Sequence, residues 1–381
     1  MHALAILAAL AAVTGLAVIG CGVVLVRRFR AAPAPFPREL PGISVLRPLH
    51  GDEPLLEVAL ASACAQDYPR FQVVFGVQDP ADAALATVRR VQARFPACDI
   101  AVVVDDTAAG RNRKVANLSN MLGAARHDLL VIADSDVHAA PDYLRHIAAA
   151  LEPAGIGLAC TLYVGRPASR TLAGRMGASA ITHGFLPGAL ISRVLGRQDA
   201  LGATMALRRP TLETIGGFAA LCDHLADDNL LGRRVRALGL GIGLAATVPA
   251  TTVPELRLAD LYRHELRWGR TIRALAPLSF AGSALQYPVA WALLAVAASG
   301  GAGWAVAVFA AAWAWRAAAA RAIDRALAQP AASPWHWPLR DLMSVAVLVA
   351  SFMGDGVDWR GVRMRAEPPP RPSAGLGIGQ A

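Results

Sequence analysis

Long apolar stretches lie at both ends of the chain, and a region of short alternating apolar and polar runs lies between them. Residues 3–26 carry no charge and are long enough to cross a bilayer as one helix. Residues 274–320 are almost uncharged, and a glycine-rich break at residues 300–303 divides them into two predicted spans. The apolar segment 342–353 is short for a full span, so we expect a short, interfacial or re-entrant helix there.

The middle region alternates apolar runs with helical stretches from residue 43 to about residue 248. The apolar runs predict strands at residues 43–46, 72–77, 100–104, 129–133 and 156–162. Helices are predicted around residues 54–65, 81–95 and 116–126. This alternation is typical of an α/β domain with a mainly parallel sheet, in which ligands bind at the C-terminal ends of the strands.

Basic residues fix the expected orientation in the membrane. Arg27, Arg28 and Arg30 directly follow the first apolar run, which places the next domain in the cytoplasm. A cleaved signal peptide would carry its basic residues before the run. The predicted organisation is a transmembrane helix at residues 3–26, a Pro-rich linker at 27–41, a cytoplasmic α/β domain at 42–273, a C-terminal membrane region at 274–355 and a tail at 356–381.

Composition agrees with a cytoplasmic domain between membrane segments. Hydrophobic residues make up 55% of the chain and charged residues only 17%, against about 25% in ordinary soluble domains. The formal net charge of +9 fits basic residues gathered on the cytoplasmic side of a membrane. Since no nucleic-acid module is found, no nucleic-acid partner is expected. The five cysteines form no CxxC pair, which argues against a zinc site or a disulfide framework.

The triplet Asp134-Ser135-Asp136 directly follows the predicted strand at residues 129–133. Two carboxylates this close repel each other, and a divalent cation that also binds phosphate oxygens relieves the repulsion. The triplet therefore indicates a Mg²⁺ or Mn²⁺ site for a nucleotide diphosphate. The alternative is a helix cap ahead of Pro141 and Asp142. No GxGxxG or GxxxxGK[ST] motif follows a strand, which disfavours a Rossmann or P-loop enzyme.

A second acidic pair, Asp227-Asp228, opens an Arg-rich helical stretch. One role for these acids is to cap the helix and compensate its dipole. The other is general base catalysis, in which a carboxylate takes the proton of an attacking hydroxyl. From the residues alone, the two roles stay equally open.

Basic and aromatic residues supply further candidates. His264, Arg267 and Trp268 lie just before the C-terminal apolar region, where they could contact a diphosphate and a sugar or form a juxtamembrane belt. Lys114 ends a basic run that could face phosphates or form a solvated turn. His183 stands alone, without a partner at metal-ligand spacing.

Taken in order, these motifs resemble those of a known superfamily. Asp79, the Asp134-Ser135-Asp136 triplet, Asp228 and Arg267-Trp268 are similar to the D, DxD, D, (Q/R)xxRW signature of inverting glycosyltransferases with a nucleotide-diphospho-sugar transferase (GT-A type) fold. Within it, the chain resembles the ceramide glucosyltransferase family over residues 40–365. The matching segments are residues 47–51, 77–80, 112–118, 202–205 and 216–218. Two positions depart from the pattern: His264 stands where Gln or Arg is usual, and Asp227 where Glu is usual.

The resemblance implies a role for each candidate. Asp79 would bind uridine, and Asp134 and Asp136 would hold the cation. Asp228 would deprotonate the acceptor. Substrate contacts would come from Lys114, His183, His264, Arg267 and Trp268.

Within the family, the chain most resembles the bacterial hopanoid-biosynthesis glycosyltransferases, on the segments 338–342 and 358–361. This implies a multi-pass protein of the bacterial inner membrane that transfers N-acetylglucosamine from UDP-GlcNAc to bacteriohopanetetrol. A ceramide glucosyltransferase with a sphingolipid acceptor and a polysaccharide synthase are the enzymatic alternatives. A non-catalytic membrane protein is the third.

Overall fold

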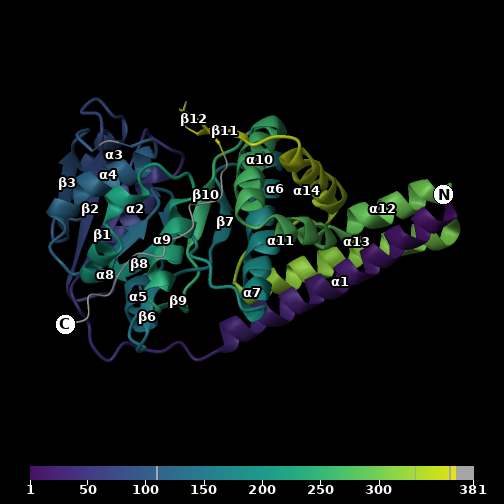
Figure 1. The fold of residues 1–381 in the computed structure, drawn as a ribbon, viewed down its shortest axis with the longest axis horizontal. Coiled ribbons are helices and arrows are strands. Elements are labelled where there is room, and N and C mark those ends of the chain that lie inside the picture. Colours follow the sequence, from purple (N-terminus) through teal and green to yellow (C-terminus); the bar gives the residue numbers. More distant parts are fainter. Residues whose placement is uncertain (109, 331, 360–361, 366–381) are drawn as a thin grey trace. The chain divides into compact units, whose positions relative to one another are not determined.

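The structure, a computed structural model, describes residues 1–108, 110–330, 332–359 and 362–365 (Figure 1). The predicted tail at residues 356–381 therefore lies largely outside the described residues. The chain forms two compact units. The sheet unit contains Ala34–Leu162 and Gln198–Pro249, and the helical unit contains Met1–Pro33, Tyr163–Arg197 and Ala250–Ala366.

A seven-stranded sheet with the order β3-β2-β1-β4-β8-β6-β9 forms the centre of the sheet unit. Its strands are β1 (Ile43–Pro48), β2 (Phe71–Val77), β3 (Asp99–Val104), β4 (Leu129–Ala133), β6 (Ile156–Cys160), β8 (Thr204–Arg208) and β9 (Gly241–Leu244). Strands β3, β2, β1 and β4 are parallel, and β9 is parallel to β6. Strand β8 runs antiparallel to its neighbours β4 and β6. The five predicted strands and the mainly parallel sheet are confirmed, although β6 ends two residues earlier than predicted.

Helices cover both faces of this sheet. One face packs against α2 (Leu56–Cys64), α3 (Ala84–Arg94) and α5 (Tyr143–Ala150). The other packs against α4 (Arg113–Met121), α8 (Arg209–Thr214) and α9 (Asp227–Ala237). Successive residues of a strand enter different layers, as Val73 and Val74 of β2 do. Because both faces are covered, β4 is buried along its whole length, which explains its unbroken apolar run.

Three helices of the helical unit pack side by side: α1 (His2–Ala31), α12 (Pro288–Ala298) and α13 (Gly303–Ala326) (Figure 1). Small residues make the contacts, among them Ala12 of α1, Ala292 of α12 and Ala312 of α13. A Cβ atom at Gly15 would lie 2.3 Å from the carbonyl oxygen of Leu285, so glycine permits the close approach there. Such small-residue contacts are typical of helices that associate in a membrane.

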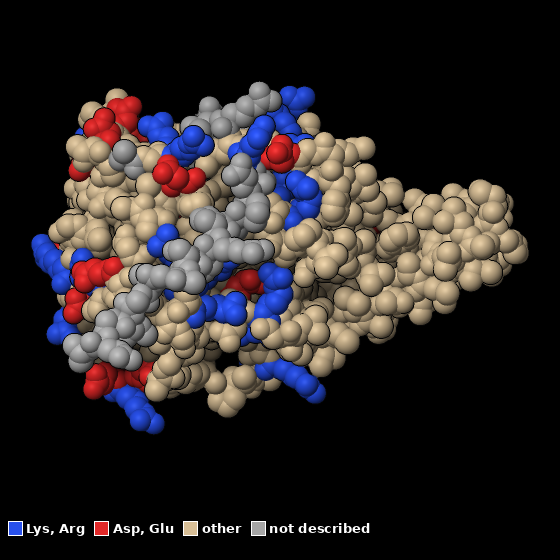
Figure 2. All heavy atoms as spheres, viewed as in Figure 1, with Lys and Arg blue, Asp and Glu red and all other residues tan. Residues whose placement is uncertain are grey.

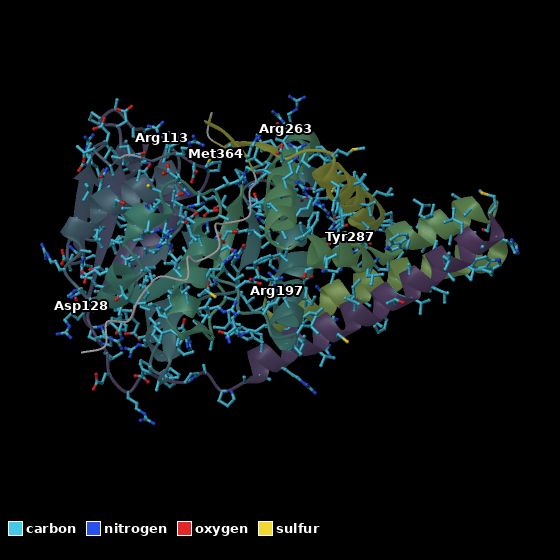
Figure 3. All side chains as sticks on the ribbon, in the orientation of Figure 1. Arg113, Asp128, Arg197, Arg263, Tyr287 and Met364 are labelled. Carbon is cyan, nitrogen blue, oxygen red and sulfur yellow. The ribbon has the colours of Figure 1, made fainter. Side chains whose placement is uncertain are left out.

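Two of these helices, α1 and α13, are long and apolar enough to span a membrane. In the described residues, the segments Pro277–Gln286 and Pro288–Ala298 add a candidate broken span with a 70° bend. Tyr287 lies at this bend (Figure 3). The predicted break near residue 301 is confirmed, since α12 ends at Ala298 and α13 begins at Gly303. Figure 2 shows no charged side chain on the visible surface of the bundle around the N-terminus.

The rest of the helical unit consists of shorter elements. A π-helical turn, η2 (Ile181–Phe185), joins α6 (Leu172–Ala180) to α7 (Leu186–Val194). Such turns inside helices occur frequently at functional sites. Strands β7 (Val164–Pro167) and β10 (Ala250–Val253) pair in parallel. The remaining elements are α10 (Leu258–Leu275), α11 (Pro277–Gly282), η4 (Ser283–Gln286), η5 (Pro334–His336), α14 (Trp337–Phe352) and the hairpin of β11 (Gly356–Trp359) and β12 (Val362–Arg365).

Candidate active site

The Asp134-Ser135-Asp136 triplet lies at the C-terminal end of β4, where a ligand is expected in a sheet of this kind. The guanidinium of Arg47, at the end of β1, holds the backbone here. Its Nη2 donates to the carbonyl oxygens of Asp134 (2.7 Å), Ser135 (3.0 Å) and Val137 (2.8 Å). The Ser135 hydroxyl donates to Glu53 at 2.6 Å. These bonds fix the loop so that it presents its two carboxylates at the edge of the sheet.

The two carboxylates of the triplet do not cap a helix. Helix α5 begins at Tyr143 with Asp142 as its N-cap residue, and no side-chain capping bond is formed there. Burial, together with the nearby charges of Asp134 and Glu53, raises the pKa of Asp136 to about 7. A carboxyl group with a raised pKa between other acids is a place where a cation binds favourably.

Lys114, in the first turn of α4, already places one positive charge in this cluster. Its Nζ lies 2.7 Å from Asp134 Oδ1 and 3.6 Å from Asp227 Oδ2. Burial by itself lowers the pKa of Lys114, but the carboxylates of Asp134 and Asp227 raise it above the ordinary value. The side chain is only 15% exposed. Lys114 therefore belongs to a helix that faces the triplet and not to a solvated turn.

Helices α4 and α9 are joined at their N-termini by Asn112, the N-cap residue of α4. Its buried amide donates to the carbonyl oxygen of His224 at 2.8 Å and to Asp227 Oδ1 at 3.3 Å. The contact brings the Asp227-Asp228 pair, in the first turn of α9, to the same edge of the sheet as the triplet.

The two acids of α9 have different surroundings. Asp227 is buried and bonded to Asn112 and Lys114. Asp228 accepts a hydrogen bond from the Asn229 backbone N–H at 2.7 Å. A Cβ atom on Gly202 would lie 2.9 Å from Asp228 Oδ2, so glycine leaves room for this carboxylate.

Its surroundings also change the ionisation of Asp228. Burial and the neighbouring Asp227 raise the pKa of Asp228 to about 6, against smaller opposite effects of its backbone hydrogen bond and Lys114. A carboxylate with a pKa just below neutral is suited to accept a proton.

The donor atoms of this cluster suit a hard divalent cation. Asp134 and Asp136 offer only oxygen ligands, which Mg²⁺ and Mn²⁺ prefer. Within the described part of the chain, no group of three or more His, Cys, Asp or Glu side chains is arranged to hold a metal ion. A cation bound by the triplet would therefore take its other ligands from substrate phosphates and water, as Mg²⁺ commonly does.

Asp79 stands somewhat apart, after the end of β2. Strand β1 separates β2 from β4 in the sheet. The Asp79 side chain is exposed and accepts a hydrogen bond from the Ala81 N–H at 2.8 Å. The sheet unit thus places Asp134, Asp136, Lys114 and Asp228 in one cluster, with Asp79 farther along the same edge.

The other sequence candidates lie in the helical unit. His264, Arg267 and Trp268 all belong to α10. The His264 imidazole pairs with Glu255 through Nδ1 and meets the Trp268 ring edge-on, with 4.4 Å between the ring centroids. Despite burial, the contact with His264 lowers the pKa of Glu255. The His264 imidazole is thereby held in a fixed orientation beside a partly exposed tryptophan.

His183 is a buried histidine in the π-helical turn η2. Its Nε2 lies 2.7 Å from Asp324 Oδ1, and its carbonyl oxygen accepts a hydrogen bond from Arg316 at 3.3 Å. Asp324 and Arg316 both belong to α13. These partners were not predicted from the sequence, although a charge within an apolar helix is itself a signal that a partner must exist.

A second buried pair lies in the same unit. Arg340 donates to both carboxylate oxygens of Glu265, at 2.6 and 2.5 Å. This two-point contact fixes α14 against α10 one residue after His264, and it too was missed in the sequence.

Comparison with known proteins gives a family match over nearly the whole chain. A family model described as glycosyl transferase family 21 matches residues 4–371. The ceramide glucosyltransferase of Komagataella phaffii is 32% identical over 107 residues, which cover 27% of this chain and 21% of that protein. Ceramide glucosyltransferase 1 of Caenorhabditis elegans is 22% identical over 244 residues, which cover 62% of this chain and 51% of that protein. The chain thus spans about half or less of the length of these curated relatives.

A solved structure shows the same fold. The mannosyltransferase PcManGT from Pyrobaculum calidifontis, in complex with GDP-Man and Mn²⁺, aligns with a TM-score of 0.50 and 22% identity. The alignment covers 91% of this chain and 99% of that one. The predicted mixed α/β fold of the GT-A type is therefore confirmed.

Proposed function

The chain belongs to glycosyltransferase family 21, and on this premise we propose that it transfers a sugar from a nucleotide diphosphate to a hydroxyl group of a membrane lipid. One observation carries the proposal. The triplet carboxylates, Lys114 and the acidic pair of α9 converge at the C-terminal edge of the sheet. This arrangement supports a cation site for a diphosphate beside a carboxylate that can act as a base.

In this proposal, Asp134 and Asp136 hold Mg²⁺ or Mn²⁺. A cation held there would neutralise the diphosphate and so make it a better leaving group. Lys114 contacts the Asp134 carboxylate and supplies a second positive charge to the phosphates. Asp79 binds the uridine at the end of β2.

Asp228 acts as the general base. Its carboxylate takes the proton of the acceptor hydroxyl while that oxygen attacks the anomeric carbon. The bond from the anomeric carbon to the phosphate oxygen breaks in the same step, and the nucleotide diphosphate leaves. A single displacement inverts the anomeric centre, so an α-linked donor gives a β-linked product. No covalent enzyme intermediate is required.

The helical unit contributes the membrane location and further substrate contacts. Helices α1 and α13 anchor the protein in a bacterial inner membrane, with the basic residues at the C-terminal end of α1 on the cytoplasmic side. His264, Arg267 and Trp268 contact the donor near the bilayer surface, and His183 contacts substrate from the turn η2. A lipid acceptor stays in the bilayer, so a reaction near its surface avoids the cost of extracting it.

For the donor and the acceptor we propose UDP-GlcNAc and bacteriohopanetetrol. The support is the resemblance of residues 338–342 and 358–361 to hopanoid-biosynthesis glycosyltransferases. Residues 360–361 of the second segment lie outside the described part of the chain. A ceramide acceptor with a glucose donor is the second candidate, favoured by the ceramide glucosyltransferases among the relatives. A polysaccharide synthase is less well supported, because a channel needs more spans than the two, or three with the bent pair, found in the described residues.

A transfer assay separates these candidates. Purified full-length protein in lipid nanodiscs receives radiolabelled UDP-GlcNAc or UDP-glucose, with bacteriohopanetetrol, ceramide or no added acceptor. We expect labelled lipid with UDP-GlcNAc and bacteriohopanetetrol, and none with the Asp228→Asn variant. Label on ceramide would move the assignment to the second candidate, and label in a polymer would indicate a synthase. Absence of transfer to every acceptor would contradict the proposed activity.

A further inference from the structure

A shallow pocket of about 420 Å³ lies between the C-terminal ends of α1 and α13. These two helices pack against each other and are the two long candidate membrane spans of the described chain (Figure 1). Three arginines and three alanines line the pocket: Arg27, Arg30, Ala31, Ala322, Arg325 and Ala326. The lining is therefore positively charged over a floor of small side chains.

The three arginines of this pocket are exposed, and among the described residues none of them forms an ion pair. Some exposed arginines elsewhere in the chain meet an acid, as Arg90 meets Glu57 and Arg126 meets Asp99. The nearest acid in sequence on α13, Asp324, is 1% exposed and is already bound to the His183 imidazole and to the Ala332 N–H.

An anion bound in this pocket would reduce the repulsion between its arginines. Arginines of two different helices line one pocket, and like charges at close range repel. The C-terminal ends of both helices carry partial negative charge, which offsets only part of this repulsion. A phosphate group that accepts hydrogen bonds from both helices would remove the repulsion and connect their ends.

The surroundings of the pocket indicate where that phosphate comes from. Val24, one turn before Arg27 on α1, is 47% exposed. Trp315, two turns before Ala322 on α13, is 48% exposed. Each candidate span thus carries an exposed apolar side chain on the membrane side of the charged pocket, so a ligand with a phosphate head and an acyl chain matches both parts. Free phosphate would use only the charged part.

We propose that this pocket binds the phosphate head group of an anionic phospholipid at the membrane surface. Basic pockets between the ends of membrane helices are suited to such head groups. The lipid would stabilise the contact between α1 and α13 at the end where the chain leaves the membrane for the sheet unit. The proposal requires that α1 and α13 lie in a bilayer, but it does not depend on sugar transfer.

Lipid binding to the full-length protein tests the proposal directly. The protein in a zwitterionic detergent is titrated with phosphatidylglycerol or phosphatidylcholine, and retained lipid is counted by native mass spectrometry. We expect phosphatidylglycerol to bind more tightly than phosphatidylcholine. The double variant Arg27→Gln/Arg325→Gln should lose roughly 20- to 30-fold in phosphatidylglycerol affinity, since each arginine near a lipid surface contributes about fivefold.

The chain offers a matched control for this experiment. Arg28 and Arg321 lie at the same ends of α1 and α13 but do not line the pocket. The variant Arg28→Gln/Arg321→Gln removes the same charge from the same helices and should keep most of the affinity. Equal losses in the two double variants would show diffuse surface charge and overturn the proposed pocket.

Two further measurements complete the test. Inorganic phosphate and a soluble glycerophosphate should displace phosphatidylglycerol only at far higher concentration, and displacement at equal concentration would mean that the pocket takes free phosphate. If the Gln variant does not fold, Arg27→Lys/Arg325→Lys keeps the charges without the guanidinium forks and should bind several-fold more weakly. Unchanged binding in that variant would contradict direct phosphate recognition.

Discussion

Lowering the pH from 8 to 5 should suppress sugar transfer by protonating Asp228. Burial and the neighbouring Asp227 raise the pKa of Asp228 to about 6. A base with that pKa is about 99% ionised at pH 8 but only about 9% ionised at pH 5, so kcat/KM should fall roughly tenfold per pH unit below 6. An ordinary aspartate, with a pKa of about 3.9, would still be more than about 90% ionised at pH 5.

Loss of activity by unfolding can be distinguished from this titration. The raised pKa means that folded Asp228 binds its proton more tightly than the unfolded chain does. Its contribution to stability is therefore present below the unfolded pKa of about 4 and is lost as the pH rises through 6, by at most about 3 kcal/mol. For this group, activity and stability change in opposite directions with pH. A melting temperature measured at each pH shows whether the fold survives where transfer stops.

Substitution of Lys114 tests whether the pH profile reports the ionisation of Asp228. Its positive charge lowers the pKa of Asp228, so Lys114→Met should move the acidic limb to higher pH. Lys114→Arg keeps the charge and should leave the limb near pH 6. Arg113→Met is the matched control, because Arg113 is the preceding residue, is exposed and forms no ion pair in the described part of the chain (Figure 3).

The profile is recorded with saturating Mn²⁺, which keeps the triplet carboxylates ionised. The position of the acidic limb is compared between variants, since Lys114→Met will also lower the maximal rate. A wild-type limb near pH 4, or a limb that Lys114→Met leaves in place, would refute the assignment of Asp228 as the base.

Three further predictions concern single residues. Asp136→Ala should lower transfer by at least about 100-fold, and EDTA should inactivate the wild type reversibly; full activity in chelator would contradict a cation site. Asp324→Asn removes the carboxylate 2.7 Å from His183 Nε2. The variant should have a lower melting temperature and a lower kcat, with an unchanged KM for the donor. An unaltered melting temperature and rate would show that the His183–Asp324 pair is dispensable. A Cβ atom at Gly165 would lie 2.5 Å from the backbone of α6, so Gly165→Ala should cost about 1–3 kcal/mol of unfolding free energy. Gly282→Ala, in open space, should cost much less by the same denaturation assay.

Apolar periodicity predicted the strands of the sheet unit well because β1, β2 and β4 are buried on both faces. Strand β8 was not predicted, because it includes Thr204 and the exposed Arg208 and is less apolar than β6. It lies between β4 and β6, antiparallel to both. Its place in the sheet depends on partners more than 40 residues away, which a local pattern does not contain.

In the candidate site too, some features were predicted from the local sequence, and others depend on residues far away in the sequence. The position of Asp134 and Asp136 after a strand followed from the sequence, because the chain must leave β4 at the edge where ligands bind. The different surroundings of Asp227 and Asp228 did not follow. They arise because the amide of Asn112 reaches α9 from the N-terminus of α4, across 115 positions of sequence.

The buried charges of the helical unit show that a sequence can predict that an ion pair exists but not which residue completes it. An arginine or aspartate inside an apolar helix costs several kcal/mol unless it is paired, so Arg316 and Asp324 each imply a partner. The identity of that partner depends on packing. Asp324 meets His183, 141 positions away, and Arg316 lies 3.6 Å from Asp341 of α14. Removal of either residue of an ion pair leaves the other charge buried and unpaired in an apolar interior. These pairs therefore determine which helices must pack together. The turn that carries His183 is therefore held by the same contacts that join α13 to α14.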